Sequence, residues 1–180
     1  MTIVRSRRAS EDRGMTIIEL CICIAILGIL MVMAAAILVR ARHAGNESSA
    51  IASLRAINTA QTAYTAVCGF GTYATSLVTL GIEPPQGGQG FIDATLASSA
   101  TPQRNGYMFR IDPGLGAVPG PRLDCYGQAT QTSYYANAVP ALEGTTGSRA
   151  FATNQQGTVY QLPGSTPPAE PFGPPAALAQ

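Results

Sequence analysis

The chain has 180 residues and a formal net charge of +1, and all 11 of its basic residues are arginine. Beyond His43 there are five arginines and seven acids, which argues against a nucleic-acid-binding surface because such a surface needs a clustered basic patch. No nucleophile, phosphate-loop or metal-ligand motif is present, and one isolated histidine leaves little for general base catalysis. We therefore predict no enzymatic activity and no cofactor, and we expect His43 to be a solvated surface residue.

A long apolar run, residues 20–39, follows a short arginine-rich segment at the start of the chain. As a helix, the run is long enough to cross the roughly 30 Å hydrocarbon core of a bilayer. Four arginines precede the run and only Arg40 and Arg42 follow it closely, which predicts a cytoplasmic N-terminus and export of the remainder. Glu19 lies at the entrance to the run. A buried carboxylate is costly unless it is neutralised or paired, so we expect Glu19 to have a function.

An ordinary secretory signal is an alternative interpretation of this segment. The alanines at 34–36 satisfy a small-x-small cleavage pattern, and cleavage there would begin the mature protein at Ile37. The chain would then be a secreted or membrane-anchored binding domain. The length of the apolar run, which exceeds a typical signal core, and the acid at its start argue against this interpretation.

The residues around the start of the run resemble the type IV pilin family, which includes the pseudopilins of type II secretion. In that family a short basic leader ends in glycine, the next residue begins the mature protein, and threonine and glutamate occupy the second and fifth mature positions. The corresponding residues here are Gly14, Met15, Thr16 and Glu19. The resemblance implies cleavage after Gly14 by a prepilin peptidase and N-methylation of Met15.

Two positions depart from the usual pattern of the family. The first mature residue is Met15 rather than phenylalanine, which leaves processing expected because the family's peptidases tolerate that position. Ala36 stands where many pilins carry a helix-kinking proline, so the sequence does not support a kink there.

The resemblance implies a structural subunit that polymerises through its N-terminal helix into a type IV pilus-like filament for adhesion, motility or DNA uptake. A pseudopilin is the alternative within the same family.

Cleavage would create a cationic amine at Met15, at the edge of the apolar run that holds Glu19. In a low dielectric the two charges attract strongly, so the amine of one subunit can set the register of a neighbour's Glu19. Pairing of Glu19 within its own chain, or snorkelling to the lipid headgroups, remains the alternative. We assign Thr16 and Glu19 to assembly.

The same resemblance implies the partners of the chain. They are other copies in a helical filament, the peptidase and N-methyltransferase, an inner-membrane assembly platform with its ATPase, and the membrane itself before assembly. The precursor is expected as a single-pass protein of the bacterial inner membrane, and the assembled filament in the periplasm or at the cell surface.

The rest of the chain predicts an α+β fold, in which a long helix packs on a small antiparallel sheet. Apolar residues recur at three- and four-residue steps from Ile51 to Val67 and give the helix one apolar face. Strand patterns then appear near 106–112 and 133–140, and residues 149–161 indicate a hairpin. The expected segments are a leader at 1–14, the membrane or assembly half of the helix at 15–39, its amphipathic half at 40–68, a connector at 69–105, the sheet at 106–162 and a flexible proline-rich tail at 163–180.

The exported part contains two cysteines that could pair and three acids that could bind calcium. Cys68 and Cys125 would reach an oxidising compartment, where they could form a disulfide; two free buried thiols are the alternative. Asp112, Asp124 and Glu143 could bind calcium, as some pseudopilins do, but their spacing matches no dense carboxylate loop and solvated surface acids are preferred.

Overall fold

The computed structural model describes residues 14–179, and within this range nothing is described for the side chains of residues 32–36. The predicted leader at 1–14 therefore lies outside the described residues except for Gly14. The chain divides after Arg40 into two compact units, the second of which is Ala41–Gln180.

One long helix, α1 (Ile17–Val67), begins three residues after Gly14 and ends one residue before Cys68. Its bounds agree with the helix expected from the sequence, and the backbone stays helical through Gly45, where the cost of glycine made a break conceivable. At the last turn the carbonyl of Tyr64 accepts hydrogen bonds from the backbone N–H groups of both Cys68 and Gly69 (2.8 and 2.7 Å). Gly71 then takes a positive φ of 89°, a conformation that glycine adopts at little cost, and the chain turns away.

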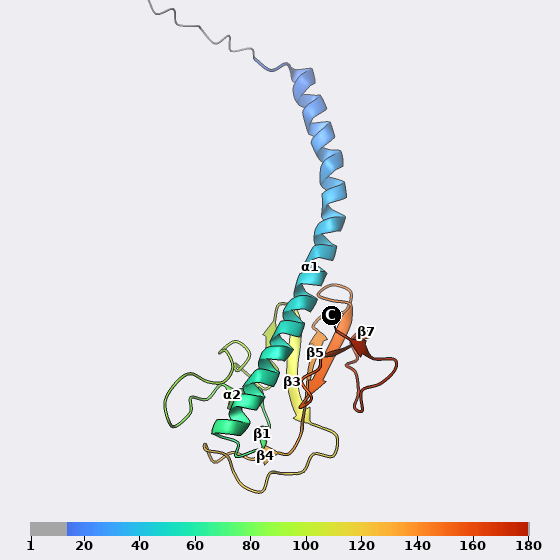
Figure 1. The fold of residues 1–180 in the computed structure, drawn as a ribbon. Helices are drawn as coiled ribbons and strands as arrows, with labels where there is room; N and C mark the ends of the chain where they lie inside the picture. Colours follow the sequence, from blue (N-terminus) through green and yellow to red (C-terminus); the bar gives the residue numbers. More distant parts are fainter. Residues whose placement is uncertain (1–13, 180) are drawn as a thin grey trace, which may run out of the picture. The chain divides into compact units, whose positions relative to one another are not determined.

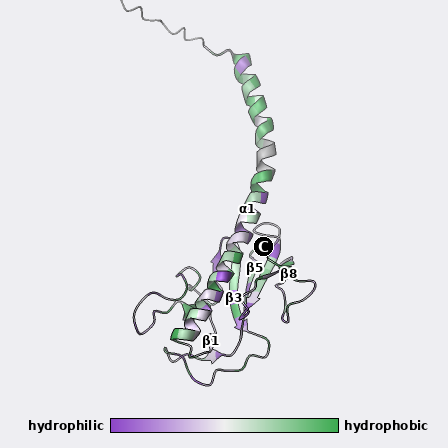
Figure 2. Cartoon of the chain, viewed as in Figure 1, coloured by the Kyte–Doolittle hydropathy of each residue, from purple (hydrophilic) through white to green (hydrophobic). Residues whose placement is uncertain are grey.

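The first unit holds the part of α1 that the sequence predicted to span a membrane. Its described side chains are exposed and mainly apolar, as the hydropathy colours of Figure 2 show. Within the described chain, which lacks the side chains of 32–36, we find no helix long and apolar enough to cross a membrane.

The second unit is built on a six-stranded antiparallel sheet with the order β2-β3-β5-β6-β7-β8. A separate two-stranded sheet pairs β1 with β4, and a short helix, α2, lies between β1 and β2 in the chain. In Figure 1 the part of α1 that belongs to this unit runs obliquely beside β3. The bounds are β1 Tyr73–Ala74, α2 Leu77–Leu80, β2 Gln103–Arg104, β3 Tyr107–Pro113, β4 Thr130–Gln131, β5 Tyr134–Pro140, β6 Arg149–Asn154, β7 Tyr160–Pro163 and β8 Ala177–Leu178.

The core lies between α1 and the large sheet. Leu54, Ile57 and Tyr64 from the predicted apolar face of α1 are fully buried, whereas Val67, which we placed on the same face, is 45% exposed, and the next residue, Cys68, is buried instead. On the sheet side β3 alternates buried and exposed residues, as a strand with one covered face does. The α+β arrangement and the β6–β7 hairpin expected from the sequence are confirmed.

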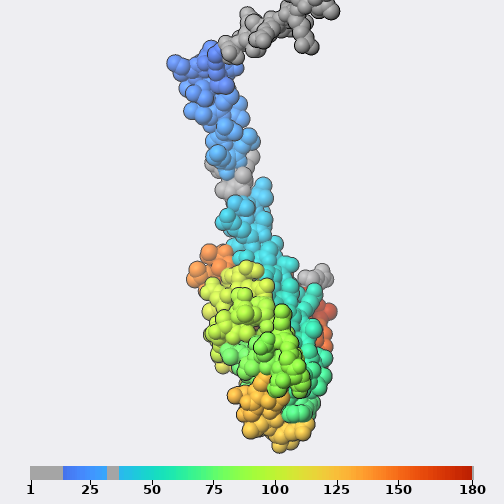
Figure 3. All heavy atoms as spheres, turned by 90° about the vertical axis from the view of Figure 1, so that its left-hand side faces the viewer, coloured from blue at the N-terminus to red at the C-terminus, as the bar shows by residue number. Residues whose placement is uncertain are grey.

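The connector at 69–105 contributes to the core as well as to the surface. Leu77 and Leu80 of α2 and the downstream Leu96 are all fully buried, and Ser76 caps α2 by accepting a hydrogen bond from the backbone N–H of Thr79. In Figure 3, where the connector is coloured green to yellow-green, its outer residues cover much of the face of this unit that is turned to the viewer.

The structure differs from the expectation of a flexible tail at 163–180. β8 pairs with β7 in the large sheet, and Phe172 stacks on Tyr160 with ring centroids 4.4 Å apart. The hydroxyl of Tyr135 donates a hydrogen bond to the carbonyl of Pro168 (2.7 Å). The proline-rich composition of the tail predicted disorder because composition does not report the contacts with Tyr160 and Tyr135, of which the latter lies 33 residues before Pro168.

Candidate functional site

The candidate site predicted from the sequence lies at the beginning of α1. Thr16 precedes the helix, and its Oγ1 accepts a hydrogen bond from the backbone N–H of Glu19 (3.3 Å), while its carbonyl accepts one from Leu20 (3.1 Å). These contacts make Thr16 the N-cap of α1. Glu19 stands in the first helical turn, where a negative charge is favourable because the helix dipole is positive at that end.

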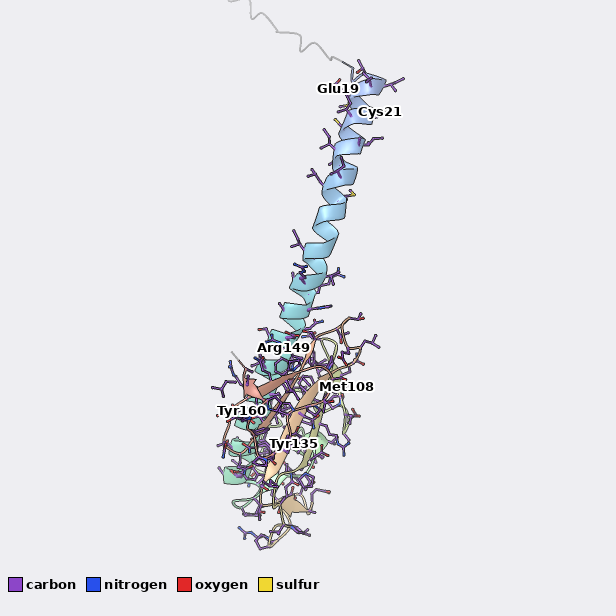
Figure 4. The ribbon with its side chains drawn as sticks, turned by 90° about the vertical axis from the view of Figure 1, so that its right-hand side faces the viewer. Glu19, Cys21, Met108, Tyr135, Arg149 and Tyr160 are labelled. Atoms are coloured by element: carbon purple, nitrogen blue, oxygen red, sulfur yellow. A yellow bond between two sulfur atoms is a disulfide. The ribbon has the colours of Figure 1, made fainter. Side chains whose placement is uncertain are left out.

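Both neighbours of the expected cleavage point are exposed. Gly14 has open space around its Cα, and Met15 is 67% exposed. Figure 4 shows Glu19 and Cys21 projecting from α1 in the first unit. Gly14, Met15, Thr16 and Glu19 lie within one short stretch of the chain, and α1 begins between the expected cleavage point and Glu19.

Beyond this start, the surface of the first unit is dominated by large apolar side chains. A soluble monomer rarely exposes a contiguous apolar surface of this kind, so a partner or a lipid phase is expected to cover it. The exposed large apolar residues of the unit are Met15, Ile17, Ile18, Leu20, Ile22, Ile24, Ile26, Leu27, Ile29, Leu30, Met31, Ile37, Leu38 and Val39.

Residues 10–35 match the family model described as the prokaryotic N-terminal methylation motif. The chain carries a prokaryotic N-terminal methylation motif. Neither the curated proteins nor the solved structures contain a match to the chain.

The methylation motif confirms the prepilin-type signal that we predicted from Gly14, Met15, Thr16 and Glu19. It supports a protein of the type IV pilin-like or pseudopilin group. Ala36, where the family often has proline, lies just beyond the motif, and its side chain is outside the described residues.

A second feature, which sequence reasoning missed, is an ion pair between a buried Glu47 and a half-exposed Arg149 that joins α1 to the sheet. The Glu47 side chain is only 6% exposed, and its Oε2 accepts hydrogen bonds from Nε and Nη2 of Arg149 (2.9 and 2.6 Å). Its Oε1 accepts from the backbone N–H and the hydroxyl of Ser148, both at 2.9 Å. Figure 4 shows Arg149 beside α1. The only sequence signal for this pair was the position of Glu47 just before the apolar face of the helix, and that position does not indicate a partner.

These contacts determine the ionisation of Glu47. Burial raises its pKa, but the hydrogen bonds from Arg149 and Ser148 outweigh burial, and the pKa of Glu47 lies below its usual 4.5. A group with a lowered folded-state pKa stabilises the fold fully above its unfolded pKa, and this contribution is lost as the pH falls through the folded value.

We expect Glu47→Gln to lower the free energy of unfolding by about 2 kcal/mol at pH 7, because hydrogen bonds to a charged group are lost. The difference from the wild type should shrink as the pH falls below 4.5, where the Glu47 carboxylate is increasingly protonated in the unfolded and then in the folded chain. Denaturant titrations of the full chain between acidic and neutral pH measure both effects. Glu83→Gln, at an exposed loop position, is the matched control and should be neutral. A constant difference across this range would contradict the role of Glu47.

Cys68 and Cys125 form a disulfide, with Cα atoms 4.9 Å apart. This decides between the two alternatives left open by the sequence. Within the described residues Cys21 and Cys23 are free and exposed, as expected for residues on an apolar run.

The three acids considered for calcium lie in different settings. Asp112 forms a salt bridge with Arg110 (2.7 Å), and Asp124 is buried and accepts a hydrogen bond from Tyr64. Glu143 is in an exposed loop. The described residues contain no group of three or more metal-ligating side chains.

His43 was expected to be a solvated surface residue; instead it is half-buried, and within the described residues its Nε2 is enclosed without a hydrogen-bond partner.

Proposed function

We propose that the chain is the subunit of a type IV pilus-like filament, and that its role is structural. The observation that carries this proposal is the methylation motif at residues 10–35, together with a helix that begins directly after the Gly14–Met15 junction. Leader removal after Gly14 by a prepilin peptidase and methylation of Met15 would prepare the subunit for assembly.

The exposed apolar residues of the first unit support two successive environments for this part of α1. Before assembly it lies in the inner membrane, with the N-terminus in the cytoplasm, and after assembly it packs against the same segment of other subunits. Apolar surface of this extent is stable only when water is excluded from it, which both environments provide. An assembly platform and its ATPase would drive the transfer between them.

Glu19 is the residue that we propose to set the register of assembly. In the described chain it stands on the first turn of α1, four residues from Met15, whose amine would become cationic on cleavage. Pairing that amine with the Glu19 carboxylate of a neighbour lets both charges leave water, whereas either charge alone would oppose burial.

The N-terminus of the mature protein tests this proposal. We expect mass spectrometry of the protein from its native cells to find a chain that begins at Met15 and carries one methyl group on its amine. An unprocessed leader would contradict processing of the motif, and a chain beginning at Ile37 would instead indicate an ordinary secretory signal. Shear-released material containing the chain would separate a surface pilus from a pseudopilin, whose filament remains in the periplasm.

A further inference from the structure

The end of α1 and the loop around Cys125 are joined by more than the disulfide. Asp124, next to Cys125, is 6% exposed, and its Oδ2 accepts a hydrogen bond of 2.5 Å from the hydroxyl of the fully buried Tyr64. Tyr64 lies one helical turn before Cys68, so residues 64 and 68 lie on the same face of the helix. The tyrosine–aspartate contact and the disulfide are therefore side by side.

Asp124 also organises the loop itself. Its Oδ1 accepts hydrogen bonds from the backbone N–H groups of Tyr126 and Gln128 (2.8 and 2.7 Å), and its own N–H donates to the carbonyl of Gln128 (2.9 Å). Both carboxylate oxygens thus have partners, so burial of the charge is compensated. Loss of the Tyr64 hydroxyl would leave Oδ2 buried without that donor, and the loop would be held less firmly.

A third contact joins the two cysteines through the backbone, because the N–H of Cys125 donates to the carbonyl of Cys68 (3.1 Å). Neither this bond nor the one between Tyr64 and Asp124 requires the sulfur atoms to be linked. Burial, and after it the hydrogen bond to Asp124, raises the pKa of Tyr64 well above its usual range, so the hydroxyl remains a donor at any physiological pH.

We propose that the Tyr64–Asp124 hydrogen bond is a latch that keeps residues 120–129 docked on the end of α1 when the disulfide is reduced. Cys68 is fully buried and Cys125 is half-buried. The latch shields the Cys68 thiol and holds it opposite Cys125, so that oxidation rejoins Cys68 to Cys125 rather than to Cys21, Cys23 or another copy of the chain. This proposal does not depend on the proposed function.

The test measures how fast the reduced thiols react in the full-length chain. Dithiothreitol delivers two electrons and two protons to the Cys68–Cys125 bond and becomes a cyclic disulfide. After its removal under nitrogen, iodoacetamide is added, and peptide-level mass spectrometry follows each cysteine separately. The fully buried Cys68 thiol reacts only from the undocked state, so its alkylation rate is proportional to the population of that state.

We expect Tyr64→Phe to raise the alkylation rate of Cys68 about tenfold to a hundredfold, the effect of losing one hydrogen bond to a charged group. The matched control is Tyr107→Phe, which removes a buried hydroxyl that donates a hydrogen bond elsewhere, to the carbonyl of Arg149 (2.8 Å). The control should leave the Cys68 rate unchanged. An unchanged rate in Tyr64→Phe, or an equal rise in Tyr107→Phe, would overturn the latch.

A second variant keeps the test decisive if Tyr64→Phe does not fold. Asp124→Asn keeps the shape of the side chain but replaces one acceptor oxygen with an N–H₂ group, and it should also raise the Cys68 rate. Near-ultraviolet circular dichroism of the oxidised variants verifies the native fold before reduction. Natively folded Asp124→Asn with the wild-type Cys68 rate would overturn the latch in the same way.

Discussion

Filament assembly is expected to fail in Glu19→Ala while insertion of the precursor into the membrane continues. The substitution removes the carboxylate that we propose as the partner of the Met15 amine in a neighbouring subunit, so the amine would have to be buried without an opposite charge. The apolar side chains that favour the membrane are unchanged. A loss of about 1.4 kcal/mol in each contact already lowers an association constant tenfold, so we expect at least about tenfold less filament.

Quantification of sheared filaments and of membrane-bound precursor measures the two steps separately. Glu143→Ala is the matched control, because it removes an exposed loop acid of the second unit and should leave filament yield unchanged. Normal filament yield from Glu19→Ala would contradict the pairing. Reduced membrane insertion would assign Glu19 to an earlier step than assembly.

Replacing both cysteines of the disulfide, Cys68→Ala with Cys125→Ala, is expected to lower the free energy of unfolding by about 4 kcal/mol. The bond closes a loop with a sequence separation of 57 residues, and the loop-entropy relation gives a value of about that size for such a loop. The effect arises mainly in the unfolded chain, which gains conformations when the link is absent. If the latch operates, the folded variant keeps residues 120–129 in place.

Chemical denaturation of the oxidised full chain and of the double variant measures the difference. Cys21→Ala with Cys23→Ala is the matched control, since these cysteines form no disulfide in the described structure, and it should leave the second unit as stable as before. A double variant at 68 and 125 with wild-type stability would show that the disulfide does not constrain the unfolded chain.

Part of the fold follows from local patterns. The three- and four-residue spacing of Ile57, Ala60 and Tyr64 predicted the buried face of α1, and alternation in 106–112 predicted β3, because these signals need only neighbouring residues. The short elements were not predicted. β1, β4 and β8 have two residues each, too few for a periodic signal, and they exist because a distant partner strand supplies their hydrogen bonds.

Buried polar residues are the other group that local patterns did not predict. Gln61 is fully buried on the apolar face of α1, and its side-chain amide both donates to the carbonyl of Ala74 (3.0 Å) and accepts from its N–H (2.9 Å). Asp124 was expected as a solvated acid and is instead buried against Tyr64. In each case the residue type alone favours solvent, and a specific partner makes burial possible.

The sequence by itself determined the methylation motif, because Gly14, Met15, Thr16 and Glu19 are contiguous residues whose spacing is their signal. It also determined the helix that follows and the class of the fold. Only the tertiary structure decided that Cys68 and Cys125 are joined and that Glu47 pairs with Arg149. The last pair is separated by 102 positions in the chain, and a contact over that distance depends on how the helix and the sheet pack, which no local pattern encodes.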